Sequence, residues 1–145
     1  MIIKEQKLND AIFVSEHIPE FDNPYPKSEY KKRLVGVQHI ILTAYSDHKP
    51  IGFKIGYKRN NDGSFYSWMG GVLPEYRKSG IAAILADHQE TWAKNKGYKT
   101  IRLKTRSKHQ AMLSFSLKRG FTITARIPKE PAEESRIILN KPLKG

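Results

Sequence analysis

One segment of the chain joins an apolar strand to a helix through a basic turn that contains glycine. It covers residues 70–82, with the sequence Gly-Gly-Val-Leu-Pro-Glu-Tyr-Arg-Lys-Ser-Gly-Ile-Ala. The first turn of a helix has backbone N–H groups without partners and carries the positive end of the helix dipole. Gly80 lets the backbone approach a ligand closely, and Ser79 can cap the helix or donate a hydrogen bond. The segment from Arg77 to Ala82 is therefore suited to surround a phosphate, although an ordinary strand-to-helix connection has the same pattern.

The net charge of +12 is concentrated around this segment. Residues 76–119 hold 11 basic and 2 acidic residues, whereas residues 1–75 hold 10 and 9 and residues 120–145 hold 5 and 3. A positive field of this kind suits a polyanionic ligand, either a phosphate-bearing cofactor or a nucleic acid. A solvated basic surface is the alternative explanation for most of these lysines.

Length and cysteine content limit the class of protein. A chain of 145 residues fits one domain, residues 1–145, which can bury about two thirds of its unfolded surface in a core. The absence of cysteine excludes disulfides, thiolate metal sites and a cysteine nucleophile, and we expect no metal. Residues 1–7 do not resemble a signal peptide, and no apolar run reaches membrane-spanning length. We therefore expect a cytoplasmic protein that has no membrane partner.

Hydrophobic periodicity and turn residues predict an alternation of strands and helices. Strands are expected at residues 2–8, 37–45, 51–57, 65–73, 100–105, 121–127 and 136–139, and helices at 11–18, 28–34, 79–95 and 108–118. Residues 46–50 indicate a hairpin with a longer loop. The strand at 65–73 is apolar on both faces and is expected at the centre of the sheet, with a bulge or a close backbone approach at Gly70 and Gly71. In the helix at 79–95, His88 is expected to be half-buried on the apolar stripe.

Three motifs occur in the order and spacing of one known family. The first consists of Val72, Pro74, Arg77, Gly80 and Ala82, and the others are Lys-Gly-Tyr-Lys-Thr-Ile-Arg-Leu at 96–103 and the helix that ends in Gly-Phe at 112–121. Together they resemble the GNAT superfamily of N-acetyltransferases, in its small bacterial-type form, and the order of elements extends the resemblance over nearly the whole chain. The resemblance implies an α+β fold with a mixed, mostly antiparallel sheet of six to seven strands and about four helices.

The resemblance also implies acetyl-coenzyme A (acetyl-CoA) as the cofactor and an amine of a small molecule or a protein as the acceptor of the acetyl group. The family's pyrophosphate loop and pantetheine contacts correspond here to Gly71, Val72, Leu73, Arg77, Lys78, Ser79, Gly80, Ile81, Ala82 and His109. Dimers are common in the family, and nothing in the sequence identifies an interface. The acceptor is determined by variable loops, so the sequence does not identify it.

The chain departs from the family pattern at three positions. Ser116 stands where the family often has a tyrosine that protonates the leaving thiolate, and Tyr66 stands where many members have a glutamate base. His109 stands where an asparagine often contacts the pantetheine arm. The candidates for the catalytic acid are therefore Tyr66, Ser116 and His109, and the base is expected to be a water chain that ends at a side chain or in open solvent. Tyr66 is equally compatible with a core or acceptor-pocket aromatic role, and His109 with a contact to cofactor or solvent at the start of a helix.

The acceptor site has candidates on one strand and in two loops. Trp68 is expected to share a face with Tyr66, since positions 66, 68, 70 and 72 alternate together, and the two rings would form an aromatic wall. A cationic amine could be received by acidic loop residues, which otherwise are simply solvated: Glu20, Asp22, Glu133 and Glu134.

Two other functions are compatible with the sequence. A GNAT-fold module that binds acyl-CoA without catalysis would explain Ser116 and Tyr66 at the usual catalytic positions. A nucleic-acid-binding module would explain the basic segment, but Arg102 and Lys104 alternate with apolar residues as on a solvated strand face, and no stacking-aromatic motif accompanies them. The pattern therefore favours the enzyme over both alternatives.

Overall fold

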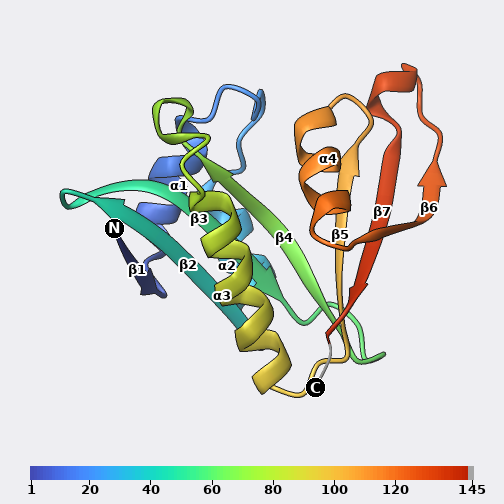
Figure 1. Ribbon diagram of the computed structural model, residues 1–145, viewed down its shortest axis with the longest axis horizontal. Helices are drawn as coiled ribbons and strands as arrows, with labels where there is room; N and C mark the ends of the chain where they lie inside the picture. The colour runs from blue at the N-terminus through green and yellow to red at the C-terminus, as the bar shows by residue number, and fades with distance from the viewer. Residues whose placement is uncertain (144–145) are drawn as a thin grey trace.

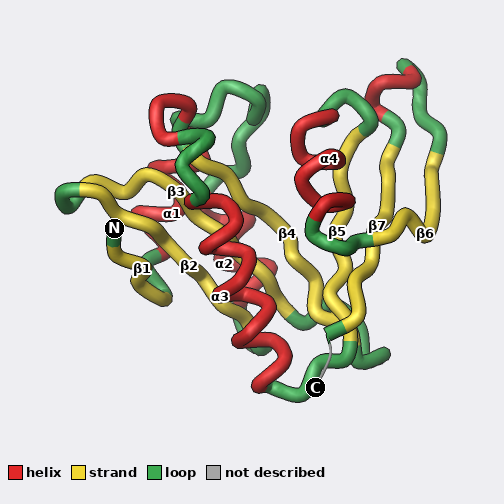
Figure 2. Tube along the Cα trace, in the orientation of Figure 1, coloured by secondary structure: helices red, strands yellow, loops and turns green. Residues whose placement is uncertain are grey.

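The computed structural model describes residues 1–143, which form a seven-stranded sheet with helices on both faces (Figure 1, Figure 2). The strands are β1 (Ile2–Glu5), β2 (His39–Ser46), β3 (Lys49–Tyr57), β4 (Ser64–Val72), β5 (Thr100–Arg106), β6 (Thr122–Ile127) and β7 (Arg136–Pro142). In the same residues the helices are α1 (Leu8–Glu16), α2 (Lys27–Leu34), α3 (Ile81–Asn95) and α4 (Gln110–Lys118), with short 3-10 turns at Pro74–Tyr76 and Ala132–Glu134.

The sheet is mixed and mostly antiparallel. The strand order is β1-β2-β3-β4-β5-β7-β6, and β4 and β5 are its parallel pair. A parallel pair needs a crossover connection, which α3 supplies. This topology confirms the expected α+β fold and the central place of the strand at residues 64–72.

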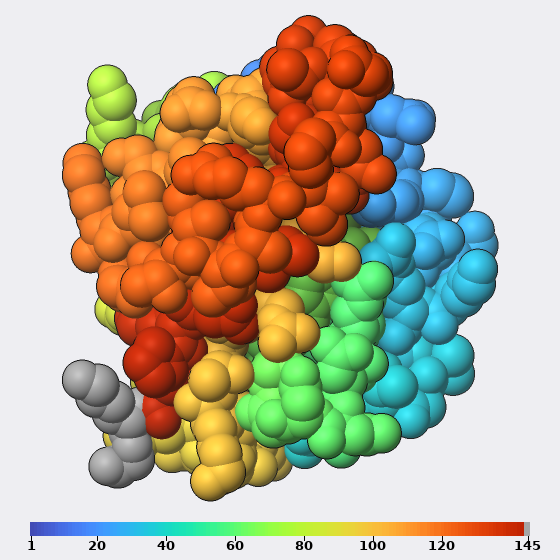
Figure 3. Space-filling view, turned by 90° about the vertical axis from the view of Figure 1, so that its right-hand side faces the viewer, coloured from blue at the N-terminus to red at the C-terminus, as the bar shows by residue number. Residues whose placement is uncertain are grey.

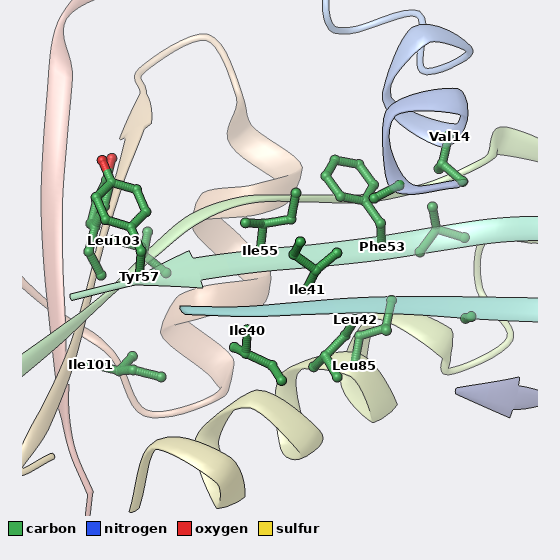
Figure 4. Packing of buried hydrophobic residues seen from close by; sticks show 14 of the residues in the cluster. Val14, Ile40, Ile41, Leu42, Phe53, Ile55, Tyr57, Leu85, Ile101 and Leu103 are labelled. Atoms are coloured by element: carbon green, nitrogen blue, oxygen red, sulfur yellow. The ribbon is translucent and has the colours of Figure 1, made fainter. Parts of the chain in front are cut away.

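Two layers of apolar side chains hold the helices to the sheet. Helix α1 packs on β2, β3 and β4 from one side, and α3 packs on the same strands from the other. Figure 4 shows Val14 of α1 on the side of Phe53 and Leu85 of α3 on the side of Ile40. All four side chains are buried. Successive residues of a strand point to opposite faces, so both layers draw on the same strands.

The connection between β2 and β3 is shorter than expected. Ser46 pairs with Lys49, which leaves a two-residue turn at Asp47 and His48. Their φ angles are 48° and 67°. Two consecutive positive φ values are the pattern of the hairpin turn whose twist matches that of the strands. The longer loop predicted from residues 46–50 is therefore wrong, because Pro50 belongs to the strand.

The bulge in β4 lies before the glycines, not at them. Gly56 pairs with Ser67 and Ile55 with Met69, so Trp68 is the extra residue. Gly70 and Gly71 pair regularly with β3. The close approach expected at the glycines does occur, since a Cβ on Gly71 would overlap the Ile18 side chain.

The bulge changes which side chains share a face. Tyr66 and Trp68 both contact the ring of Tyr57, so these two share a face as expected. Beyond the bulge the alternation shifts: Gly71 faces Ile18 and Gly70 lies beside Lys54 on the opposite side. The expectation that positions 66, 68, 70 and 72 all share one face is therefore wrong.

The buried stripe of α3 also differs from the expected one. Ile81, Leu85, Gln89 and Ala93 are buried, whereas His88 is exposed. Residues four apart stack on one side of a helix, and His88 lies about 100° around the helix from Gln89. The stripe places a fully buried amide under α3 in place of a half-buried histidine.

Candidate functional site

The parallel strands β4 and β5 pair over only part of their length. Their register runs from Ser64 with Thr100 to Ser67 with Leu103. Beyond that point β4 continues to residue 72 and β5 to residue 106, and the two strands diverge (Figure 1). Helices α3 and α4 follow the ends of these strands. An opening at the carboxyl ends of adjacent strands is the usual ligand position in sheets of this kind.

The turn that leads from β4 into α3 has the geometry of an anion-binding cradle. Gly80 is the N-cap of α3 with φ 84°, and Lys78 also has a positive φ of 64°. The first helical bond is donated by the Ile84 amide to the Gly80 carbonyl, at 3.1 Å. The amides before Ile84 therefore have no acceptor within the helix. Within residues 1–143, nothing comes within 4 Å of a Cβ built on Gly80, so this turn faces open space.

Ser79 does not cap the helix. Its Oγ donates to the Tyr76 carbonyl at 2.5 Å, which stabilises the turn itself. Because Gly80 takes the N-cap position with no side chain, the amides of the first turn keep their N–H groups available for a ligand. Of the two roles that the sequence allowed for Ser79, the donated hydrogen bond is found and the cap is not.

Arg77 connects the cradle to the N-terminal part of the chain. Its guanidinium donates to both carboxylate oxygens of Glu20, at 2.8 and 2.9 Å, and its Nε donates to the Val72 carbonyl at 2.9 Å. The Arg77 hydrogen bond holds the pKa of Glu20 below its usual value. The side chain of Arg77 thus positions the loop, and the cradle is made mainly of backbone. Val72, Leu73 and Ile81 are buried, so they too offer backbone groups only.

A second cluster of charges lies at the start of α4. Lys108 contacts Glu134 at 2.7 Å and Asp22 at 3.5 Å. His109 beside it is the half-buried N-cap of α4, and burial lowers its pKa, followed by the charges of Lys108 and Arg106. Glu20, Asp22 and Glu134, which the sequence offered as receivers of an amine, are therefore engaged with cations of the chain; Glu133 is exposed.

Tyr66 lies on the α1 face of the sheet, under cations. Its ring meets that of Tyr57 edge-on with centroids 5.5 Å apart, and it is 7 % exposed. The Arg59 guanidinium lies 5.0 Å and the Lys104 ammonium 5.9 Å from the ring centre. Burial raises the pKa of Tyr66, so the phenol keeps its proton at neutral pH. It is therefore unsuited to be a general base there.

Ser116 lies on the opposite face, in a narrow cavity between α3 and α4. Its side chain is 2 % exposed, and its Oγ lies 3.7 Å from the Met112 sulfur. The cavity has a volume of about 10 Å³, which is room for about one water molecule. Its other polar lining residues include Lys54, Ser67, Gln89, Glu90 and Arg119. Tyr66, Ser116 and His109 are thus distributed over both faces and one end of the opening.

Lys54 is a residue of this cavity that the sequence did not single out. It lies over Gly70, where an added Cβ would come 3.5 Å from the lysine Nζ. Burial lowers the pKa of Lys54 to about 8, opposed only in part by the charge of Glu90. The Glu90 carboxylate is occupied by Arg119 at 2.9 Å and Lys141 at 2.7 Å. The signal for this site was a lysine in an otherwise apolar strand, residues 51–57.

Gln89 adds an unsatisfied amide to the same cavity. In the part of the chain that the structure describes, neither its amide oxygen nor its nitrogen has a hydrogen-bond partner, although the side chain is fully buried. Buried polar groups without partners are rare and commonly mark a place for water or a ligand. The α3–α4 side of the opening is therefore polar and incompletely satisfied.

A larger depression of about 530 Å³ lies elsewhere, between the end of α1 and the segment after β4. Its lining includes His17, Phe21, Lys49, Leu73 and Glu75. In the part of the chain that the structure describes, none of the three catalytic candidates, Tyr66, Ser116 and His109, lines this depression. Of the residues expected to contact the cofactor, Leu73 is the one in this lining, beside Pro74 and Glu75.

Comparison with known proteins agrees with this geometry. The family model described as "Acetyltransferase (GNAT) family" matches residues 10–121. Among curated proteins no sequence match is found. Within residues 1–143, no helix is long and apolar enough to cross a membrane.

Many solved structures share the fold at low sequence identity. An aminoglycoside 6'-acetyltransferase type Ii superposes with a TM-score of 0.84 at 18% identity, covering 100% of this chain and 99% of that chain. An aminoglycoside 6'-N-acetyltransferase complexed with coenzyme A has a TM-score of 0.83 at 16% identity, with 100% and 98% covered. The ribosomal-protein-S18-alanine N-acetyltransferase from Escherichia coli has a TM-score of 0.80 at 16% identity, with 99% and 96% covered.

Proposed function

Because the chain belongs to the GNAT family of acetyltransferases, we propose that it is an acetyl-CoA-dependent N-acetyltransferase that acetylates a primary amine by direct transfer. The observation that carries this proposal is the cradle at Gly80, which presents free helix N-terminal amides at the open end of β4 and β5. Such a turn binds phosphate groups, and the pyrophosphate of coenzyme A supplies two of them. The similarity in fold to an acetyltransferase complexed with coenzyme A supports the proposal.

The residues present fit the cofactor. The backbone from Lys78 to Ala82 would hold the pyrophosphate, with open space at Gly80 for its approach. Backbone groups of Gly71 and Val72, on the strand edge that β5 leaves unpaired, would bind the pantetheine amides. His109 at the start of α4 would contact the arm from the other side. Arg77 would act as a positioning residue, since its guanidinium is engaged by Glu20 and Val72.

Acetyl-CoA would supply a thioester, from which the acceptor nitrogen takes the acetyl group as the carbon–sulfur bond breaks. The departing thiolate, with a thiol pKa of about 8.5, needs a proton or a positive charge. Ser116 replaces the tyrosine that supplies the proton in many relatives, and Lys54 lines the same cavity with an ammonium whose pKa is lowered to about 8. Lys54 would therefore stabilise and protonate the thiolate. Ser116 would relay this proton or orient its donor.

Calorimetry with acetyl-CoA tests the proposal directly. Gly80→Val places a β-branched side chain in the cradle, and we expect it to weaken acetyl-CoA binding by at least about tenfold. Gly97→Val is the matched control, because Gly97 ends α3 with φ 94° and equally open surroundings within residues 1–143. Both variants carry the same backbone strain, of about 1 kcal/mol. Absence of binding by the wild type, or equal binding by both variants, would contradict the proposal.

A second candidate is an acyl-CoA-binding protein without transferase activity. The observations that favour it are the neutral Tyr66 at the usual base position and the separation of Tyr66 from Ser116. It predicts acetyl-CoA binding without thiol release over a broad panel of amines. Turnover of any amine would exclude it.

A further inference from the structure

We infer that the acceptor is an amine that also carries an anionic group, a carboxylate or a phosphate; this inference rests on the proposed acetyl transfer. The group would bind to a cationic surface that we define by Arg59, Lys104 and Arg136, with Arg33 and Arg102 at its margin. This surface surrounds Tyr66, on the face of the sheet where the opening between β4 and β5 begins.

Strand alternation places these charges on one face. Ile101 and Leu103 of β5 line the cavity on the α3–α4 face, so Arg102 and Lys104 point to the other face. Tyr66 is the register neighbour of Arg102 on that face. Helix α1 packs mainly on β2, β3 and β4. Figure 3 shows the first third of the chain, in blue to cyan, on the right and the β6–β7 region, in orange to red, on the left. The green and yellow to light-orange atoms of the middle of the chain lie between them.

Within residues 1–143, the three central charges of this surface, those of Arg59, Lys104 and Arg136, have no carboxylate partner. Burial lowers the pKa of Lys104, and the charges that lower it further are those of Arg59, Arg136, Arg102 and Arg33. Arg33 pairs with Glu29 and Arg102 with Asp62. Among the ion pairs within residues 1–143, none engages Arg59, Lys104 or Arg136. Such a field attracts an anion and repels a polycation.

Aromatic side chains give the surface a wall. The Arg33 guanidinium stacks 4.5 Å from the centre of the Trp68 ring, which also contacts Tyr25 and Tyr30. These rings pack against each other and are partly covered by cations. They form a side wall for a small ligand rather than an exposed platform on which bases of a nucleic acid would stack.

The positive potential of this cationic surface also explains how the acceptor amine loses its proton without a glutamate base. An ammonium placed beside several cations loses its proton more readily, because nearby like charge disfavours the charged form. The acceptor would therefore reach the opening as a neutral amine, with its proton released to water. Its nitrogen then forms the bond to the acetyl carbon, and the carbon–sulfur bond breaks. The nitrogen loses a second proton as the amide forms, and this proton balances the one that the thiolate takes up.

A panel of matched amines tests the inference by thiol release. O-phosphoethanolamine and glutamate are compared with ethanolamine and glutamine amide, and spermidine represents a polycation. We expect kcat/KM to be at least about tenfold higher for the anionic member of each pair. Lys104→Gln should remove most of this preference. Lys94→Gln, which removes one exposed charge from α3, should leave it unchanged.

The outcomes separate this inference from the proposed function. Equal or faster turnover of neutral or cationic amines, or an unchanged preference in Lys104→Gln, overturns the inference and leaves the transferase intact. If acetyl-CoA binds but no amine turns over, calorimetry of O-phosphoethanolamine with the coenzyme A-loaded protein decides, and no binding overturns it. Binding of RNA or DNA that blocks this surface, without binding of the small anions, also overturns it. Failure to bind acetyl-CoA refutes the proposed function, and the inference with it.

Discussion

Lys104 and Lys108 are four residues apart at the end of β5, yet their surroundings are opposite. Lys108 contacts two carboxylates, and the Glu134 hydrogen bond raises its pKa. Lys104 lies among arginines, and burial and their charges lower its pKa. Lys108 connects the chain to itself, whereas Lys104 keeps its charge available for a ligand. The comparison teaches that the total charge of a basic segment says little until its partners are known.

The largest expected effect comes from reversing the charge at Lys104. Lys104→Glu should lower kcat/KM for an anionic acceptor by about 100-fold, because the carboxylate repels the ligand and pairs with the neighbouring arginines. Acetyl-CoA binding should be unchanged. Steady-state thiol release and calorimetry measure the two quantities. If Lys108→Glu produced the same loss of acceptor specificity, the contrast between the two lysines would have no functional meaning.

A third lysine, Lys54, extends the comparison to a half-buried position that lines a cavity. Lys54→Met should lower kcat by about 10- to 100-fold, since it removes the proposed acid. In the wild type kcat should fall as the pH rises through about 8, where Lys54 loses its proton. The variant should lack this limb of the pH profile. A wild-type profile without a transition near that pH would contradict the role of Lys54.

The same substitution should also make the protein more stable. The folded pKa of Lys54, about 8, lies below its ordinary value of 10.5, so the unfolded chain binds more protons between these values. Wild-type stability should therefore rise with pH across this window. Lys54→Met should gain about 1–3 kcal/mol at pH 7, because a half-buried ammonium without a close partner is costly. Urea unfolding of both proteins at several pH values measures the difference.

Ionic strength should have a smaller effect, on KM for the acceptor. Raising the ionic strength from about 0.05 M to about 0.3 M should increase KM for an anionic acceptor by about threefold, because the cationic surface is screened. KM for a neutral amine should stay constant. Parallel titrations with O-phosphoethanolamine and ethanolamine show the difference, and an equal response of both would remove the electrostatic explanation.

The smallest effect is expected at Lys108. Lys108→Met removes its contacts with Glu134 and Asp22 and should lower Tm by no more than about 3 °C, as is usual for exposed ion pairs. The preference for anionic acceptors should remain. Thermal unfolding followed by circular dichroism gives the first quantity, and the amine panel gives the second. Loss of the preference would place Lys108 in the acceptor site after all.

Local sequence was sufficient for the order of elements and for the cradle. The conformation of residues 70–82 is determined locally, because a strand, a basic turn and a left-handed glycine at position 80 depend on neighbours along the chain. The motif order then led to the α+β fold. Sequence predicted the turn at Asp47 and His48 and the bulge at Trp68 less well. Both depend on how two strands align, and a shift of one residue in that alignment changes them.

The sequence by itself determined the fold class and the position of the glycine turn that leads into α3, while the tertiary structure decided which charges have partners. Arg77 and Glu20 are far apart in the chain, and so are Lys108 and Asp22, so their pairing follows from the packing of loops on the sheet. The same packing left Lys104 among arginines and placed Lys54 of β3 at the cavity between α3 and α4. Electrostatic interactions depend on distance and burial in space, and neither can be derived from spacing along the chain.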